Sequence, residues 1–148
     1  MTPHGGGVST YIRELWRAYA DYPELLDGLS VQLRTGRTND LSGPDVQSWA
    51  IPARGAGRLA ASFAGGRCRV FHGLDGVLPP RRLLPKGART VVSVHDLSVF
   101  DLPDRGRVRT EAKRRALASS IRRADAVIAI SHFTAGRIAH HFGRDDVE

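Results

Sequence analysis

The segment GARTVVSVHD, Gly87 to Asp96, decides the fold class. Its centre is a nearly continuous run of Thr, Val and Ser, which is typical of a strand buried on both faces of a parallel sheet. The run ends at His95 and Asp96, two polar residues able to carry chemistry. It therefore predicts the middle of an α/β domain with polar groups at the carboxyl end of a strand.

Two further apolar runs lie on either side of this segment. CRVFHG, Cys68 to Gly73, predicts a strand before it, and DAVIAIS, Asp125 to Ser131, predicts a third buried strand after it. LSVFDLPD, Leu97 to Asp104, is interpreted as a loop that leads into a long basic helix from about Arg105 to Arg123. A last helix is predicted from the spacing of Ala135, Ile138, Ala139 and Phe142, with Gly143 as its end. This alternation predicts a Rossmann-like parallel sheet with helices on both faces.

The first half of the chain is less regular. From Gly7 onward, apolar residues recur at helical spacing as far as Tyr19, and Pro23 ends the helical region. Strands are predicted at Leu29 to Thr35 and within VQSWAIP, residues 46–52, and a short helix at residues 57–64. The length of 148 residues predicts one domain over the whole chain, residues 1–148.

Composition excludes several classes of protein. Apolar residues make up 41% and charged residues 25%, as in a folded domain rather than a disordered one. The apolar runs are much shorter than the roughly 20 residues of a membrane span, and no leader pattern is present, so we expect a cytoplasmic protein. Cys68 is the single cysteine, and the vicinal His140 and His141 point to different helix faces, so no metal site is predicted.

The chain is strongly basic, with a formal net charge of +7. Twenty of its 22 basic residues are arginine, which indicates either anionic partners or GC-rich codon usage. The segment RGRVRTEAKRR is interpreted as a membrane or anion contact, or else as a solvated helix face. No aromatic residues interleave with it, so we expect no nucleic-acid partner. The proposed contact residues are Arg105, Arg107, Arg109, Lys113, Arg114 and Arg115.

Polar residues follow each predicted strand at the edge where α/β proteins bind ligands. His95 and Asp96 are candidate catalytic residues that would hydrogen-bond a sugar hydroxyl or steer a proton, or else a pair that caps and orders the loop. Ser131 is favoured as a helix N-cap, with a binding role as the alternative. His72 is favoured as a loop histidine over a ligand-binding one.

The glycines Gly5, Gly6 and Gly7 precede the first helix. Unshielded backbone N–H groups at a helix N-terminus favour a phosphate, so these residues are candidate phosphate-binding positions. They match neither the dinucleotide-binding nor the P-loop pattern. The alternative is a flexible glycine-rich segment.

Four segments in this order, HGGGVSTYIREL, VFHGLDGVLPP, VVSVHDLSVFDLP and RRADAVIAISHFTAGRIAHHFG, resemble the N-terminal half of family 4 glycosyltransferases. The resemblance covers nearly the whole chain, most strongly Val70 to Gly143, and is greatest to bacterial mannosyl- and glucosyltransferases that build surface polysaccharides or glycolipids. It implies the GT-B fold, which has two Rossmann-like domains and a cleft between them.

The resemblance also implies a reaction. A hexosyl group moves from a nucleotide-diphosphate sugar to a glycan or lipid-linked acceptor, with retention of configuration and without an obligatory metal or other cofactor. The N-terminal half mostly binds the acceptor, and its glycine loop faces the donor diphosphate. The family histidine near the reacting sugar matches His95, and Ser131 matches a position on the cleft floor. In several relatives a basic helix docks on the membrane, which would place this protein peripherally at its inner face.

The sequence departs from the family in two respects. No strand precedes the glycine loop, and no Glu-x7-Glu pair of the donor-binding half is present. We therefore expect a partial domain that lacks its first strand and the second domain and is inactive alone. The alternatives are a non-catalytic subunit that pairs with a separate C-terminal donor-binding half, and a basic module that binds anions or membrane surfaces.

Overall fold

The computed structural model describes residues 7–22, 24, 34–35, 49–50, 69–101 and 107–148. The chain divides into two compact units, Met1–Ala64 and Gly65–Glu148. The first unit contains helix α1 (Gly7–Asp21) and two short parallel strands, β1 (Arg34–Thr35) and β2 (Trp49–Ala50). The predicted helix at residues 57–64 and most of the strand predicted at Leu29 to Thr35 lie outside the described residues.

Helix α1 has the amphipathic pattern expected from its sequence. Trp16 is buried, whereas Arg13 and Arg17 are exposed on the other side. Arg17 also pairs with Glu14 one turn earlier, at 2.9 Å. The helix ends at Asp21, two residues before the proline that predicts its end.

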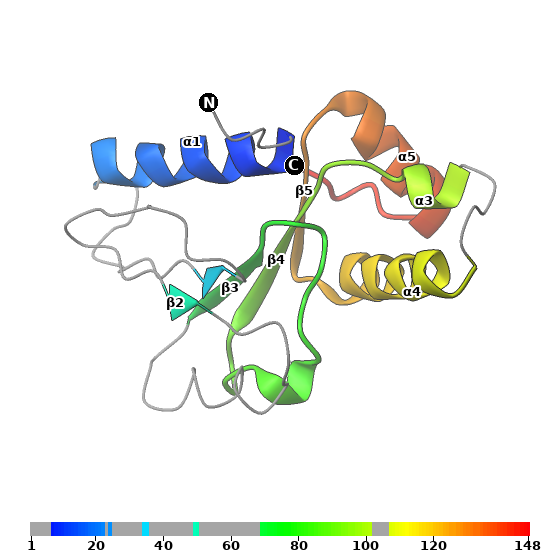
Figure 1. Cartoon of the computed structure of the whole chain (residues 1–148), viewed down its shortest axis with the longest axis horizontal. Helices are drawn as coiled ribbons and strands as arrows, with labels where there is room; N and C mark the ends of the chain where they lie inside the picture. The colour runs from blue at the N-terminus through cyan, green and yellow to red at the C-terminus, as the bar shows by residue number, and fades with distance from the viewer. Residues whose placement is uncertain (1–6, 23, 25–33, 36–48, 51–68, 102–106) are drawn as a thin grey trace. The chain divides into compact units, whose positions relative to one another are not determined.

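The second unit holds a three-stranded parallel sheet in the order β3-β4-β5 (Figure 1). The strands are β3 (Val70–Gly73), β4 (Arg89–Val94) and β5 (Ala126–Ala129). A 3-10 turn, η2 (Arg81–Leu83), lies between β3 and β4. Two long helices follow the strands, α4 (Arg107–Arg123) and α5 (His132–Phe142). The predicted α/β class, with a Rossmann-like parallel sheet flanked by helices, is confirmed.

The core of this unit lies between the sheet and these two helices. Val92, Val94 and Val127 from the strands pack with Ile121 of α4 and Ile138 of α5 in one buried cluster. The register pairs Val92 with Val127, which puts both side chains on the same side of the sheet. Helices α4 and α5 therefore cover one side together.

Strand β4 is the centre of the sheet, as its composition predicts. Thr90, Val92, Ser93 and Val94 are each at most 1% exposed. The third predicted strand is less enclosed, since Val127 alone among the residues of β5 is fully buried.

One predicted loop is wrong in part. Ser98–Asp101, inside the expected loop, forms a short helix, α3. The carboxylate Oδ1 of Asp96 accepts hydrogen bonds from the backbone N of Ser98 at 3.0 Å and from its Oγ at 2.6 Å. This Asx-type contact satisfies a donor at the start of the turn and so favours the helical conformation.

Candidate functional site

The three strands end at one edge of the sheet, and the candidate residues lie there. Leu74 follows β3, His95 follows β4, and Ile130 follows β5. The backbone N of Ile130 donates to the carbonyl O of Val94 at 3.3 Å, which extends the pairing to the last residue of β4. His95 is therefore in the middle of the edge, with the chain leaving β3 on one side and the chain leaving β5 on the other.

His95 is fixed by a hydrogen bond to the neighbouring strand end. Its Nε2 lies 2.8 Å from the carbonyl oxygen of Leu74, and the ring is half-buried. A carbonyl oxygen only accepts hydrogen bonds, so Nε2 carries the proton. This contact sets both the orientation and the tautomer of the imidazole.

Asp96 orders the chain that follows β4 through its contacts with Ser98. Ordering of this loop was one of the two interpretations of His95 and Asp96. The hydrogen bonds from Ser98 hold the pKa of the Asp96 carboxyl group below the ordinary value. The ammonium of Lys113 and the ring of His95 lower this pKa further. Asp96 is therefore a carboxylate at neutral pH. Lys113, predicted as a membrane or anion contact, thus acts electrostatically on Asp96 of the candidate site.

His72 does not lie in a loop, so that interpretation is wrong. It belongs to β3, and its Nε2 lies 2.8 Å from Oγ of Ser93 on β4. Residues 72 and 93 share one side of the sheet because His72 pairs with Val91, two residues before Ser93. Burial lowers the pKa of His72, so its ring is neutral at pH 7.

Ser131 caps the helix that follows β5, as predicted. Its Oγ accepts a hydrogen bond from the backbone N of Thr134 at 3.2 Å. At the other end of α5, Gly143 adopts a left-handed conformation with φ of 63°, and its N–H donates to the carbonyl of Ala139. Both helix boundaries follow from local signals.

The glycine positions are covered only in part. Gly7 is the first residue of α1 and belongs to the other compact unit. Gly5 and Gly6 lie outside the described residues. Their predicted role toward a donor phosphate stays a prediction.

The predicted basic contact residues have different surroundings. Arg105 lies outside the described residues, and the side chains of Arg107 and Arg109 are outside them too. Arg115 is 79% exposed and pairs with Glu111 at 2.9 Å. Arg114 is only 32% exposed and turns toward α3.

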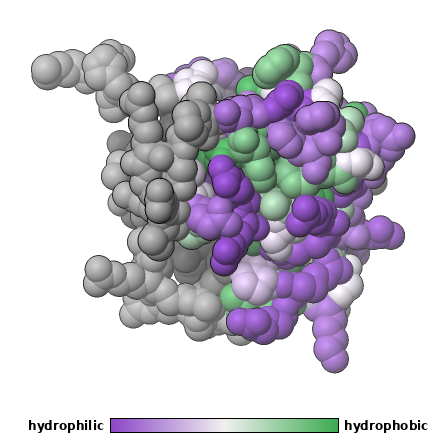
Figure 2. All heavy atoms as spheres, turned by 90° about the vertical axis from the view of Figure 1, so that its right-hand side faces the viewer, coloured by the Kyte–Doolittle hydropathy of each residue, from purple (hydrophilic) through white to green (hydrophobic). Residues whose placement is uncertain are grey.

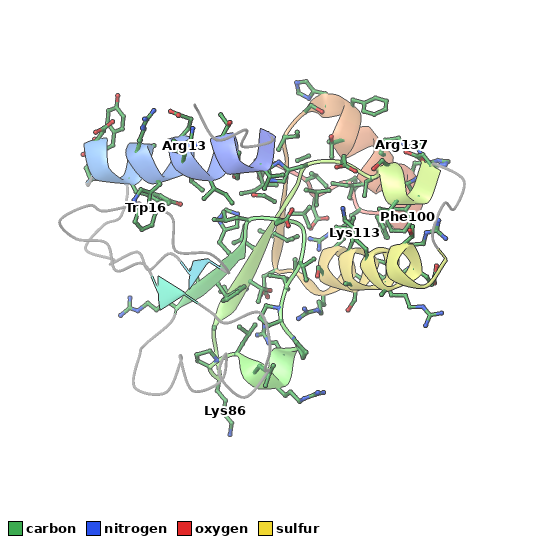
Figure 3. The ribbon with its side chains drawn as sticks, in the orientation of Figure 1. Arg13, Trp16, Lys86, Phe100, Lys113 and Arg137 are labelled. Atoms are coloured by element: carbon green, nitrogen blue, oxygen red, sulfur yellow. The ribbon has the colours of Figure 1, made fainter. Side chains whose placement is uncertain are left out.

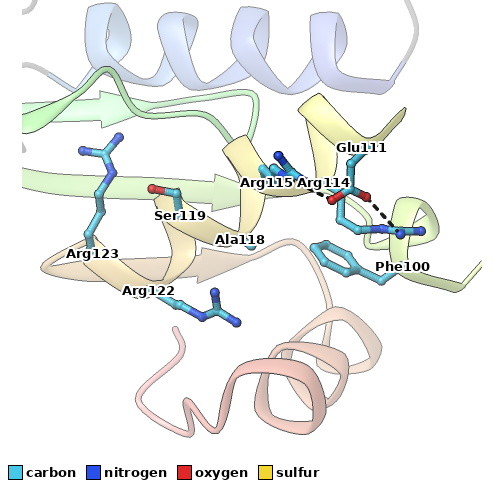
Figure 4. A pocket seen from close by; sticks show the side chains of 8 residues that line it. All are labelled: Phe100, Glu111, Arg114, Arg115, Ala118, Ser119, Arg122 and Arg123. Atoms are coloured by element: carbon cyan, nitrogen blue, oxygen red, sulfur yellow. Dashed lines mark hydrogen bonds and ion pairs between the residues drawn. The ribbon is translucent and has the colours of Figure 1, made fainter. Parts of the chain in front are cut away.

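A groove of about 530 Å³ runs along the side of α4 that faces away from the sheet (Figure 4). Its volume lies within the range of small-ligand sites. Figure 2 shows the face of the molecule at the right-hand side of Figure 1, where hydrophilic side chains surround a band of apolar ones. The residues that line the groove are Phe100, Glu111, Arg114, Arg115, Ala118, Ser119, Arg122 and Arg123.

Sequence reasoning missed two groups of residues. Ser120 is fully buried, and its Oγ accepts from the backbone N of Leu78 at 2.8 Å while donating to the carbonyl of Ala116 at 2.8 Å. Asp101, which ends α3, pairs with Arg137 and lies 3.3 Å from Nε2 of His141. The buried role of Ser120 could have been inferred from its place among the apolar positions of the helix. No local sequence pattern indicates the contacts of Asp101.

Two further observations concern the part of the chain that the structure describes. None of its helices combines the length and the apolar character needed to cross a membrane. Within the same residues, no group of three or more His, Cys, Asp or Glu side chains is placed to hold a metal ion.

One of three comparisons with known proteins gave a match. A family model described as Glycosyltransferase Family 4 matches residues 5–148. Neither the comparison with curated proteins nor the one with solved structures gave a match. Nearly the whole chain is matched, and its parallel sheet with polar residues at the carboxyl edge has the Rossmann-like form expected of that family. The chain belongs to glycosyltransferase family 4.

Proposed function

We propose that the chain forms the acceptor-side wall of a glycosyl transfer site, with His95 beside the reacting sugar. The observation that carries the proposal is the place of His95, which stands in the middle of the carboxyl edge with its ring fixed 2.8 Å from the Leu74 carbonyl. A ring held in this way needs no reorganisation when it meets a substrate hydroxyl. Asp96 lies beside it as a carboxylate.

The proposed reaction is transfer of a mannosyl- or glucosyl-type group from a nucleotide-diphosphate sugar to a polysaccharide or glycolipid acceptor, with retention of configuration. The acceptor oxygen forms a bond to the anomeric carbon, and the bond from that carbon to the diphosphate oxygen breaks. The nucleoside diphosphate leaves with the bonding electrons, and the acceptor proton passes to it. The resemblance assigns the donor diphosphate to a second Rossmann-like domain, so we propose that this chain does not transfer sugar by itself.

Sugar binding tests this proposal directly. Saturation-transfer NMR is recorded with methyl α-mannoside, methyl α-glucoside, GDP-mannose and UDP-glucose, for the unmodified chain, His95→Ala and Lys86→Ala. Lys86 is an exposed residue between η2 and β4, at the opposite end of β4 from His95 (Figure 3). We expect signal from at least one glycoside, its loss in His95→Ala and its retention in Lys86→Ala. Equal signals in all three proteins would refute the role of His95.

A turnover measurement tests the second part. Release of nucleoside diphosphate is followed with the same sugars and donors. We expect no release of nucleoside diphosphate above the blank rate. Release above that rate would contradict the assignment of donor binding to a second domain.

A second candidate function, contact with an anionic membrane surface, is favoured by the groove on α4. Helix α4 contains seven basic residues and one acidic residue, a net charge of +6 out of +7 for the whole chain. Arg115 and Arg122 lie in this groove on the side away from the core. Anionic lipid attracts such side chains by roughly 1 kcal/mol each near the surface.

Vesicle co-sedimentation tests this second function. We expect binding to vesicles of phosphatidylglycerol and phosphatidylcholine, but not of phosphatidylcholine alone, and a decrease as salt is added. The double variant Arg115→Ala with Arg122→Ala should bind less, and Lys86→Ala should bind nearly as well as the unmodified chain. Binding that does not respond to salt would exclude an electrostatic contact.

A further inference from the structure

Helix α3 lies directly after the candidate site, and it is too short to be stable by itself. It spans Ser98–Asp101 and begins three residues after His95. The cost of the first helical turn is not recovered in a segment of one turn. Its place therefore comes from its neighbours: Asp96 at its start, the buried Leu97 before it, and side chains of α4 and α5.

Arg114 of α4 contacts the backbone of α3 directly. Its Nε and Nη2 donate to the carbonyl oxygen of Val99 at 2.9 and 2.8 Å. Carbonyls near the end of a helix have no partner inside it, so this fork of two donors supplies one. The remaining nitrogen, Nη1, donates to Glu111 at 3.3 Å. All three nitrogens of the guanidinium are thus engaged, and Figure 4 shows the contact with Glu111 and the Phe100 ring nearby.

The aromatic ring of α3 adds to this contact. The guanidinium carbon of Arg114 lies 5.9 Å from the centroid of the Phe100 ring, within the range of a cation–π interaction. The same ring packs edge-on against Phe142 of α5, with centroids 5.4 Å apart. Phe100 is therefore held between the two long helices.

Helix α5 holds the last residue of α3. Asp101 pairs with Arg137, and Figure 3 shows Arg137 and Phe100 where α3 approaches α5 and α4. Nε2 of His141 lies 3.3 Å from Oδ1 of Asp101 and 2.9 Å from Arg137 Nη2. Helix α3 is thus fixed from two sides, by Arg114 on its backbone and by Arg137 on its side chain.

We propose that Arg114 is a positioning residue for His95. By holding Val99, it fixes the chain between β4 and α3 and so keeps Nε2 of His95 on the carbonyl oxygen of Leu74. The importance of this for sugar transfer rests on the function proposed for His95, whereas the geometric effect does not. The bidentate contact requires the arginine fork, so lysine at this position does not replace it.

NMR of the histidine ring tests the proposal. A ring N–H proton is seen when a hydrogen bond slows its exchange with water, so the unmodified chain should show the Nε2–H signal of His95. We expect this signal to be lost in Arg114→Ala and Arg114→Lys. Arg115→Ala is the matched control, since it removes the neighbouring, exposed arginine, and it should retain the signal.

The outcomes separate this proposal from the proposed function. Loss of the His95 signal in Arg114→Lys, with the amide spectrum of β4 and α5 unchanged, supports a positioning role. Retention of the signal in either Arg114 variant overturns it. Loss that accompanies collapse of the whole folded spectrum also overturns it, because Arg114 would then be a general structural residue. None of these outcomes depends on sugar binding. The experiment therefore tests the role of Arg114 even if the proposed function of His95 is wrong.

Discussion

Replacement of Gly73 by alanine should destabilise the sheet edge that holds His95. Gly73 ends β3, and a Cβ there would lie 2.6 Å from the carbonyl oxygen of Val77 and 2.9 Å from Cδ2 of Leu78. The first of these is a backbone atom, so the loop itself must shift. Forcing one extra carbon into a packed site costs about 1–3 kcal/mol. The shift also moves Leu74, whose carbonyl fixes His95, so the His95 ring N–H signal should weaken.

The matched control is Gly136→Ala, the same chemical change in open space. Gly136 lies inside α5, and nothing comes within 4 Å of a Cβ built on it. Alanine in a helix interior is favoured over glycine by roughly 0.5–1 kcal/mol, so this variant should be more stable than the unmodified chain. The two substitutions therefore have opposite expected signs.

The assay must report on the second compact unit. Trp16 and Trp49 both belong to the first unit, so tryptophan fluorescence is unsuitable. Urea unfolding followed by circular dichroism, together with exchange of the amide protons of β4, measures the free energy of unfolding where the change is made. A Gly73→Ala protein as stable as the unmodified chain, with Gly136→Ala behaving as expected, would refute the argument from steric contact.

Three further predictions follow from single contacts. Ser120→Ala leaves the buried N–H of Leu78 without its acceptor, and urea unfolding should show a loss of about 1–3 kcal/mol. Asp96→Ala removes the acceptor at the start of α3 and should cost about 1 kcal/mol in the same measurement. Because burial lowers the pKa of His72 in the folded state, the unfolded chain binds the proton more readily. Stability should therefore fall as the pH drops below about 6.5, and His72→Asn should reduce this slope in a pH series of unfolding experiments.

Sequence was sufficient where the signal is local. The run of β-branched residues predicted β4, and Ser131 and Gly143 predicted both ends of α5. A cap acts on backbone groups within four residues, so its effect can be read from neighbours in the sequence. The place of His95 at the edge was also predictable, because it follows directly from the end of a strand in a parallel sheet.

Pairing between distant segments was not predictable. The contact of His72 with Ser93 depends on the register of β3 against β4, and a shift of one residue would turn His72 to the other side of the sheet. Helix α3 combines both kinds of contact, since Asp96 supports its start locally while Arg114 from the next helix holds the Val99 carbonyl. A single turn carries too little periodicity to be recognised without that partner.

The side of α4 on which each arginine lies could not be predicted from the sequence either. Leu117 and Ile121 are the large apolar residues of its buried face, and Ser120 is buried beside them. With so few apolar markers, the pattern does not tell which arginines flank the core and which face water.

The net charge of α4 therefore overstates the number of cations available to a ligand. Arg114 donates to the carbonyl of Val99 and Arg123 to that of Leu78, so two guanidinium groups of one helix serve as partners of distant backbone. A carbonyl dipole does not neutralise a charge, so these arginines still add to the long-range field that attracts anions. In the proposed contact with an anionic surface, direct contact falls to exposed groups such as Arg115. Attraction and contact are thus assigned to different residues of the same helix, which is why substitution of Arg115 and substitution of Arg114 should have separable effects.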